Sequence, residues 1–241
     1  MKKNFTEYYN KEFRAFALSK IFESSDKSTH IHILRREGEL KQFSDMLKFF
    51  NDKVEVIVYP AWDCLPYSNI SPRKEIISKR YSALRALEGV GKSHKIFLLS
   101  VDSVIQKIVP IKEILKNSFS LKINQKVILS NLIEWLEKMG YSRQTNVYSI
   151  GEYALRGGIL DVFVPEIKYP IRLDFFGTKL EKIRTFDPSS QRSNGSIKNV
   201  SIFPVSEIIL DEEVINTFRQ NYRRTIGTVK TDDRVYNSIS E

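Results

Sequence analysis

The first hundred residues alternate between two spacings of apolar positions. Apolar residues three and four apart predict amphipathic helices over residues 5–23, 39–50 and 71–87, with a short helix over 102–108. Runs rich in Ile, Val and Leu predict strands over residues 31–34, 54–59 and 95–100. Strands that alternate with helices are typical of a parallel α/β sheet. Ser71 and Pro72 are expected to open the third helix, as its N-cap and first helical residue.

After residue 140 the dominant spacing changes to two. Apolar and polar side chains alternate along residues 169–176, which predicts a strand with two different faces. Gly177-Thr178 is a two-residue loop typical of a hairpin, and residues 179–186 are expected to return as its second strand. Gly157-Gly158 permits a tight turn or bulge before a further strand over residues 159–164.

The spacing divides the chain into three parts. Residues 1–120 predict an α/β unit, residues 121–210 a β-rich α+β unit, and residues 211–241 a shorter final segment. A helix over residues 131–139 is expected in the second part, with Ser130 before it and Gly140 at its C′ position. The final segment predicts a helix over residues 211–224 and has few packing signals after it.

The composition describes a basic globular chain. It has 241 residues and a net charge of +9, and residues 1–120 hold 21 Lys and Arg against 14 Asp and Glu. This charge is compatible with nucleic-acid contact, although the lysines are scattered over several predicted helices. Cys64 is the single cysteine, so neither a disulfide framework nor a Cys-based metal site is expected. Without a signal peptide or a long apolar run, we expect a cytoplasmic protein that does not contact a membrane.

No stretch has a pattern typical of catalysis. Gly89–Ser93 resembles the end of a phosphate-binding loop, but it follows a predicted helix and precedes a strand, the reverse of the order that directs backbone N–H groups at phosphate. His30 and His32 have no third metal ligand nearby in the sequence. Asp161 and Asp174 are candidate paired carboxylates without any sign of a pocket. We therefore expect no catalytic, cofactor or metal site.

The unusual feature of the predicted sheet is its polar face. Arginine, carboxylate and aromatic side chains alternate onto this face from neighbouring strands. Such a mixture is typical of protein-binding surfaces, where Arg and aromatic residues are enriched, and a solvated face with incidental charges is the alternative. The residues concerned are Asp161, Phe163, Arg172, Asp174 and Phe176, with Arg143 and Arg156 just upstream.

Three motifs resemble the N-terminal region of the bacterial transcription-repair coupling factor. They occur in the family's order over residues 54–205, which makes the resemblance more specific than any single motif. Family members are several hundred residues longer, so the chain resembles an N-terminal portion of one. The motifs are Tyr59–Tyr67 with Ser71-Pro72 and Glu75–Arg80; Gly151–Phe163; and Tyr169–Phe176 with Phe186–Arg192.

The resemblance implies a fold and a partner. The family's N-terminal module is similar to the excision-repair protein UvrB: a degenerate RecA-like domain of the P-loop fold with a parallel sheet, followed by an inserted β-rich α+β domain. By this resemblance residues 1–120 are the RecA-like domain, residues 121–210 interact with UvrA, and residues 211–241 begin the return to the first domain. The positions that match the UvrA-binding surface are Arg143, Arg156, Phe163, Arg172 and Asp174.

Two departures separate the chain from UvrB itself. UvrB would carry a phosphate-binding loop near its N-terminus and a long hairpin that clamps DNA. Residues 13–30 contain no glycine, and only a short stretch separates Leu65 from Glu75, so neither feature is expected here. Both departures favour the coupling factor.

The sequence therefore predicts a non-catalytic adaptor that recruits UvrA in transcription-coupled nucleotide excision repair. By resemblance the full-length protein is an ATP-dependent DNA translocase, whose later domains would bind ATP, Mg²⁺, DNA and RNA polymerase and would mask the UvrA-binding face. Two alternatives stay open: a nucleic-acid-binding domain that acts through net charge and the lysines of residues 1–120, and a fragment of the UvrB type.

Overall fold

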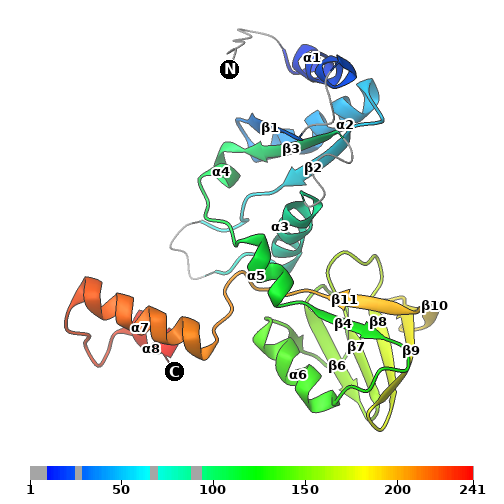
Figure 1. Ribbon diagram of the computed structural model, residues 1–241, viewed down its shortest axis with the longest axis vertical. Coiled ribbons are helices and arrows are strands. Elements are labelled where there is room, and N and C mark those ends of the chain that lie inside the picture. Colours follow the sequence, from blue (N-terminus) through cyan, green and yellow to red (C-terminus); the bar gives the residue numbers. More distant parts are fainter. Residues whose placement is uncertain (1–9, 25–28, 66–69, 88–93, 241) are drawn as a thin grey trace. The chain divides into compact units, whose positions relative to one another are not determined.

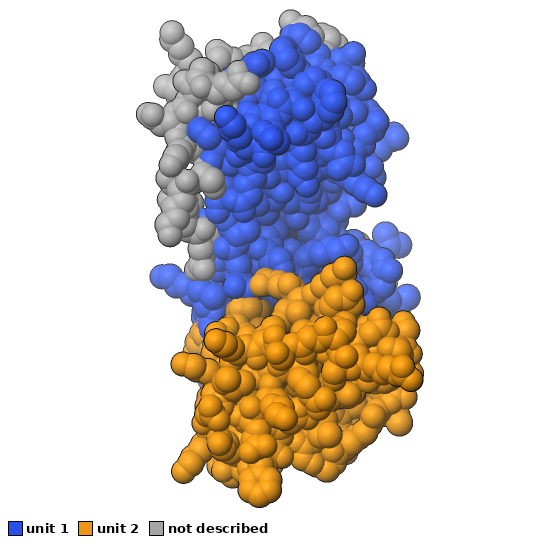
Figure 2. Space-filling model, turned by 90° about the vertical axis from the view of Figure 1, so that its right-hand side faces the viewer, with its two compact units in different colours: residues 1–115 blue, residues 116–241 orange. Residues whose placement is uncertain are grey.

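The computed structural model describes residues 10–24, 29–65, 70–87 and 94–240 (Figure 1). It is a mixed α/β protein that divides into two compact units, residues 1–115 and 116–241 (Figure 2). The predicted domain boundaries at residues 120 and 210 stay predictions. Gly89–Ser93 lies outside the described residues, so the exclusion of a phosphate-binding loop there also stays a prediction.

Unit 1 is built on a three-stranded parallel sheet. Its strands are β1 (Thr29–Leu34), β2 (Glu55–Tyr59) and β3 (Lys95–Ser100), in the order β1-β3-β2. Parallel neighbours require crossover connections, and the crossovers here contain η1 (Glu37–Glu39) with α2 (Leu40–Phe50), and α3 (Lys74–Ala86). In Figure 1, α1 (Lys11–Ser24) and α2 lie on one side of the sheet and α3 lies on the other.

The alternating strand pattern supplies apolar side chains to both faces of this sheet. On the α1–α2 side the buried core consists of Ala15, Leu34, Leu40, Phe43, Leu47, Val54, Ile96 and Leu98. On the other side α3 buries Ile77, Tyr81, Ala83 and Leu84. Both faces are therefore apolar, as parallel sheets require.

The buried Arg80 side chain contacts the loop that follows β2 and fixes its conformation. Arg80 is fully buried on α3, and its guanidinium lies 4.4 Å from the centre of the Tyr59 ring and 5.1 Å from that of Trp62. It donates to the carbonyl oxygen of Pro60 at 2.9 Å and to Oε1 of Gln106 at 3.0 Å. The motif residues around Trp62 thus have a structural role in unit 1.

Two predicted helix starts are wrong. α3 begins at Lys74, and its N-cap is Arg73 in extended backbone, because the Asp63 carboxylate accepts the Arg73 N–H at 3.0 Å from ten residues upstream. Ser71 and Pro72 therefore precede the helix. α6 (Leu129–Lys138) begins after Ile128, so Ser130 lies inside its first turn and caps nothing.

Short elements between the main ones also differ from the prediction. The helix expected over residues 102–108 is shorter: α4 (Val101–Val104) begins directly after β3, where the Ser100 hydroxyl accepts the Ser103 N–H at 3.2 Å. α5 (Ile111–Lys116) has no counterpart among the predicted elements.

Unit 2 contains a six-stranded sheet in the order β10-β9-β8-β7-β6-β5. All neighbours are antiparallel except β5 and β6. A separate antiparallel pair joins the strand before α6 to the last strand. The strands are β4 (Phe119–Lys122), β5 (Ser142–Arg143), β6 (Glu152–Arg156), β7 (Ile159–Val162), β8 (Ile171–Phe176), β9 (Lys179–Phe186), β10 (Ser193–Ile197) and β11 (Asn199–Ile202).

One face of the six-stranded sheet carries the core of unit 2. We call it the inner face; α6 and the β4–β11 pair cover it. Period-two alternation places Tyr153, Leu160, Val162, Ile171, Leu173 and Ile183 there, against Leu132 and Leu136 of α6 and Leu121, Val200 and Ile202 of the pair. The opposite, outer face is therefore free to carry polar residues.

Glycines end the elements of unit 2 as predicted. Gly140 has φ +90°, and the N–H of Tyr141 donates to the Leu136 carbonyl at 2.9 Å, which closes α6 by a Schellman motif. Gly157 (φ +60°) and Gly177 (φ +57°) supply the positive φ of the two hairpin turns. The predicted hairpin of β8 and β9 is confirmed.

The final segment, residues 211–241, contains more structure than its sequence predicted. α7 (Glu212–Ile226) begins at the Asp211 carboxylate, which accepts the Val214 N–H at 2.8 Å. α8 (Arg234–Ser240) packs on α7, although few packing signals were expected after residue 224. The contact is aromatic: Tyr236 of α8 lies 5.6 Å from Tyr222 of α7, between ring centres.

Candidate functional site

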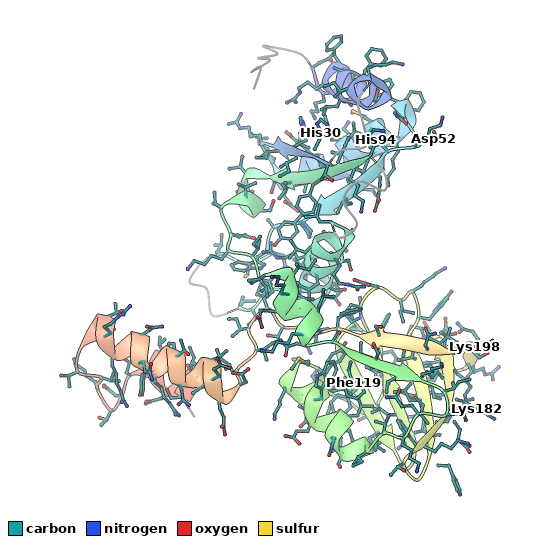
Figure 3. The ribbon with its side chains drawn as sticks, in the orientation of Figure 1. His30, Asp52, His94, Phe119, Lys182 and Lys198 are labelled. Carbon is teal, nitrogen blue, oxygen red and sulfur yellow. The ribbon has the colours of Figure 1, made fainter. Side chains whose placement is uncertain are left out.

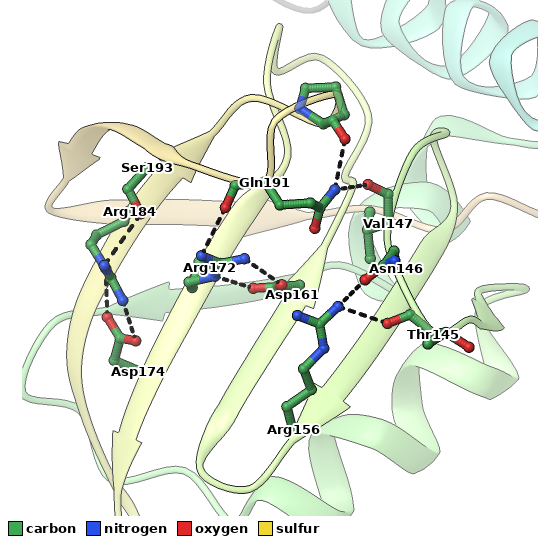
Figure 4. Close-up of polar contacts among 11 residues, drawn as sticks. Thr145, Asn146, Val147, Arg156, Asp161, Arg172, Asp174, Arg184, Gln191 and Ser193 are labelled. Atoms are coloured by element: carbon green, nitrogen blue, oxygen red, sulfur yellow. Dashed lines mark hydrogen bonds and ion pairs between the residues drawn. The ribbon is translucent and has the colours of Figure 1, made fainter.

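The outer face of the sheet brings charged residues from four strands together (Figure 4). Strand register aligns Asp161 of β7 with Arg172 of β8, and Arg172 with Arg184 of β9. A second register row aligns Arg156 with Ile159, Ile159 with Asp174, and Asp174 with Lys182. The predicted mixture of Arg and carboxylate on one face is therefore present, although its members are arranged in pairs.

Asp161 and Arg172 form a bidentate ion pair. Nε of Arg172 lies 2.7 Å from Oδ1 of Asp161, and Nη2 lies 2.8 Å from Oδ2. The pair is largely buried, since 15% of the Arg172 side chain and 3% of the Asp161 side chain are exposed. The hydrogen bonds to Asp161 raise the pKa of Arg172. The guanidinium also lies 4.6 Å from the centre of the Phe186 ring, so it is held rigidly.

Asp174 has its own arginine. Arg184 donates from Nε and Nη2 to the two carboxylate oxygens of Asp174, at 2.8 and 2.7 Å, and from Nη1 to the Ser193 hydroxyl at 3.2 Å. This pair is more accessible than the first, with 35% of the Arg184 side chain exposed. Asp174 is thus a fixed carboxylate with 19% of its side chain exposed.

Arg156 is the last residue of β6 and lies opposite Ile159 on the outer face. Its Nη2 donates to the Thr145 carbonyl at 2.8 Å and contacts Oδ1 of Asn146. The residue is exposed, and its recorded partners are neutral oxygens in the loop before β6. Its charge is therefore available to a partner's carboxylate.

Two loops close the other end of the outer face. Gln191, in a positive-φ backbone, donates from Nε2 to the carbonyls of Val147 at 3.2 Å and Pro188 at 2.7 Å. Beneath these loops Val147, Ala154 and Phe186 form a small buried cluster, and the half-buried Phe163 packs against it. Phe163 is therefore mainly a packing residue of the outer face.

Arg143 lies elsewhere on the sheet. It is exposed on the edge strand β5, and its register partner is Tyr153, a residue of the inner-face core. Residues paired in a ladder project to the same side of a sheet, so Arg143 projects toward the α6 side. The structure thus brings Arg156, Phe163, Arg172 and Asp174 to one face and separates Arg143 from them.

What stays accessible is an open row, which we define as Arg156, Ile159, Asp174 and Phe176. Ile159 is 37% exposed and Phe176 is 77% exposed. Sequence reasoning assigned no role to Ile159 and did not identify Arg184. The signal for Ile159 was its place directly after the Gly157-Gly158 turn, opposite Arg156. No local sequence pattern indicated Arg184, because the bulge between Asp174 and Phe175 shifts the β8–β9 register and so aligns Arg184 with Arg172.

The open row has the composition of a protein-binding surface. A fixed carboxylate, a guanidinium bound to neutral oxygens and two apolar side chains are the components of a directional protein interface. Among the described residues, no three His, Cys, Asp or Glu side chains lie close enough to hold a metal ion. Within the same residues, no helix is long and apolar enough to cross a bilayer.

The residues of the open row lie in a segment that matches a known family model. Residues 119–208 match the family model described as the UvrB interaction domain, a range that encloses β4 through β11. Unit 2 thus carries a domain of the UvrB interaction class.

Most of the chain is similar to proteins named transcription-repair-coupling factor. It is 33% identical to the transcription-repair-coupling factor of Haemophilus influenzae over 228 residues, which are 94% of this chain and 20% of that protein. The corresponding proteins of Rickettsia bellii and Escherichia coli are each 29% identical, over 91% and 86% of this chain and 19% and 17% of their own length. The chain is therefore a relative of the transcription-repair-coupling factors, as its motifs predict, and spans about a fifth of their length.

Proposed function

We propose that this chain is a non-catalytic adaptor module of a transcription-repair-coupling factor and that unit 2 recruits UvrA. The observation that carries the proposal is the open row of Arg156, Ile159, Asp174 and Phe176 on a UvrB interaction domain. Arg156 is available to a partner's carboxylate, Asp174 to a partner's cation, and Phe176 to an apolar pocket. Exposed aromatic and Arg side chains are enriched at protein interfaces.

The ion pairs behind the row support this function indirectly. Arg172 and Asp161 use their charges on each other, so we assign Arg172 the role of holding the sheet and its neighbour Asp174 in place. Arg184 keeps Asp174 oriented in the same way. Rigid presentation of a carboxylate lowers the conformational cost of binding.

Unit 1 serves as the scaffold in this proposal. Its parallel sheet with helices on both sides is compatible with a RecA-like domain that has lost its nucleotide chemistry. ATP and Mg²⁺ binding, and contacts with RNA polymerase and DNA, would belong to later domains of a longer cytoplasmic protein. One of those domains would cover the open row until UvrA is needed.

Truncation of Arg156 and Phe176 tests the proposal. We expect Arg156→Ala and Phe176→Ala each to weaken UvrA binding by about 2 kcal/mol, roughly thirty-fold in Kd, because Arg is a hot-spot residue type and exposed Phe is enriched at interfaces. Binding of purified UvrA to the immobilised chain measures the effect. Arg172→Ala is the poorer probe, since it leaves the Asp161 carboxylate buried without its cation and destabilises unit 2.

Lys138→Ala is the matched control. Lys138 lies exposed on α6, which covers the opposite face of the sheet, and removing its charge should leave the Kd for UvrA unchanged. If neither Arg156→Ala nor Phe176→Ala changes the Kd for UvrA, the open row is not part of the interface. A loss with Arg143→Ala alone would place the contact at the β5 edge instead.

A further inference from the structure

A second charged surface of unit 2 adjoins the open row, since Lys179 is the register partner of Phe176. The segment that follows β4 runs beside the start of β9: the Asn124 N–H donates to the Leu180 carbonyl at 2.7 Å, and the Leu180 N–H donates to the Gln125 carbonyl at 3.0 Å. On its other side the Ile123 N–H donates to the Lys198 carbonyl at 3.1 Å. Three stretches that are far apart in sequence therefore form one continuous edge.

Four exposed lysines project from these stretches, and we call them the lysine edge: Lys122, Lys126, Lys179 and Lys198. Lys126 lies directly opposite Lys179 in an antiparallel bridge, and Lys122 lies opposite Asn199, the neighbour of Lys198. Lys182 borders the edge, and Figure 3 shows it on the same side of unit 2 as Lys198.

The lysine edge is not neutralised by the protein. Across the part of the chain that the structure describes, none of these four lysines takes part in a recorded ion pair. Glu181 is the single carboxylate within residues 122–126, 179–182 and 196–199. Like charges directly opposite each other in a ladder are destabilising. The outer face differs, because Arg172 and Arg184 each have their own aspartate.

We propose that the lysine edge binds the phosphate backbone of double-stranded DNA without reading its sequence. Lysine ammonium groups without carboxylate partners are the groups that replace counterions on a nucleic-acid backbone. Within the edge itself Leu121 and Leu180 are buried and Ile123 and Ile197 are half-buried, and the exposed Phe176 opposite Lys179 belongs to the open row. Protein-binding surfaces, by contrast, are depleted in lysine and centred on aromatic or apolar anchors.

This DNA contact goes beyond recruitment of a protein partner and uses different residues from the open row. It also differs from binding through net charge, which would draw on lysines throughout the chain. The two surfaces on one unit would let the chain touch DNA while the outer face holds its partner.

The test measures how a fluorescein-labelled DNA duplex of about 30 base pairs binds to the whole chain. Fluorescence anisotropy gives the Kd at salt concentrations between roughly 50 and 200 mM. We expect a Kd in the range from micromolar to about 0.1 mM and a slope of log K against log salt near about −3.6, for four phosphates neutralised. The quadruple Lys→Gln variant at 122, 126, 179 and 198 should lose at least about tenfold in affinity, and the slope should fall by about one for each lysine.

The matched control removes the same charge from unit 1, by Lys→Gln at the exposed residues Lys41, Lys48, Lys53 and Lys112. It should retain most of the affinity; an equal loss in the control would show binding through net charge and overturn the proposal. Competition by polyglutamate as strongly as by unlabelled duplex would instead assign the edge to an acidic protein. Absence of duplex binding at the lowest salt would also overturn it.

Two further measurements separate folding and recruitment from DNA contact. The double variant Lys126→Gln/Lys179→Gln relieves a repulsive pair, so it should fold and still lose affinity for the duplex. UvrA binding should be unchanged in the Lys122→Gln/Lys198→Gln variant, whose residues belong to the β4–β11 side of the edge, and reduced by Arg156→Ala. The two proposals can therefore fail independently.

Discussion

At the residue scale, the environment of a side chain decides whether its charge is available. Arg156 and Arg172 are both arginines of the same face, but Arg172 is bound to Asp161 and Arg156 contacts neutral oxygens. A guanidinium in a bidentate pair cannot also grip a partner's carboxylate without breaking that pair. Residue type alone therefore does not identify the binding arginine.

His32 shows the same dependence on environment, with a consequence for stability. Its ring stacks on Phe43, with ring centres 4.8 Å apart, and burial together with the nearby Arg14 cation lowers the pKa of His32 to about 4. The unfolded chain binds the proton near the ordinary pKa of about 6.5. Between these two values the unfolded state holds more protons, so the free energy of unfolding must fall as pH falls from about 6.5 toward 4.

Replacing His32 with Phe should remove this part of the pH dependence while keeping an aromatic stack. Urea unfolding at pH about 7.5 and about 5, followed by Trp62 emission in a Trp135→Phe background, measures the stability of unit 1. The parent should lose more stability between these two pH values than His32→Phe. Equal losses in parent and His32→Phe would contradict the assignment.

At the element scale, glycine positions show which turns the backbone requires. Gly140 ends α6 with φ +90°, and a Cβ there would lie 2.7 Å from Cβ of Ser206. Gly157, in the β6–β7 turn, has φ +60° but nothing within 4 Å of its would-be Cβ. Both glycines have a positive φ that strains any other residue. Of the two, Gly140 is the one where an added Cβ would also clash with a neighbour.

Gly140→Ala should therefore cost more stability than Gly157→Ala. We expect a loss of about 2 kcal/mol or more at Gly140, from strain plus the clash, and about 1 kcal/mol at Gly157 from strain alone. Urea unfolding followed by Trp135 emission, in a Trp62→Phe background, reports on unit 2. Equal costs at the two positions would show that Ser206 can move aside.

Element boundaries show how far local sequence predicts this fold. The strands of the parallel sheet, the β8–β9 hairpin and the end of α6 follow from apolar spacing and glycine position. The start of α3 does not, because Asp63, ten residues upstream, accepts the N–H of the N-cap residue Arg73. β10 was not predicted either; most of its residues are polar, and its pairing with β9 defines it.

At the scale of the whole molecule, the question is whether unit 1 retains nucleotide binding. Ligands of parallel α/β sheets bind at the carboxyl ends of the strands. There the Glu37 carboxylate accepts the Ser100 hydroxyl at 2.6 Å and the Ala61 N–H at 3.2 Å. A carboxylate at this edge repels phosphate and occupies donors that a nucleotide would need.

We therefore expect no heat of binding when MgATP is titrated into the chain in a calorimeter. Glu37→Gln removes the negative charge and serves as a comparison, and it too should bind no nucleotide, since removing repulsion does not create a phosphate cradle. Saturable binding of MgATP to the parent chain would contradict the scaffold role of unit 1.

The sequence by itself determined the period of each segment, the glycine turns, and the motifs that relate this chain to the transcription-repair-coupling factors. It also placed arginine, aspartate and phenylalanine on one face of a sheet, because side chains alternate along any strand. Only the tertiary structure decided which charges meet. Strand register and the bulge after Asp174 pair Asp161 with Arg172 and Asp174 with Arg184, and within the described residues they leave Arg156 and the lysine edge without recorded carboxylate partners. Such pairing depends on residues distant in the chain that come within a few ångströms of each other, and no local pattern encodes that distance.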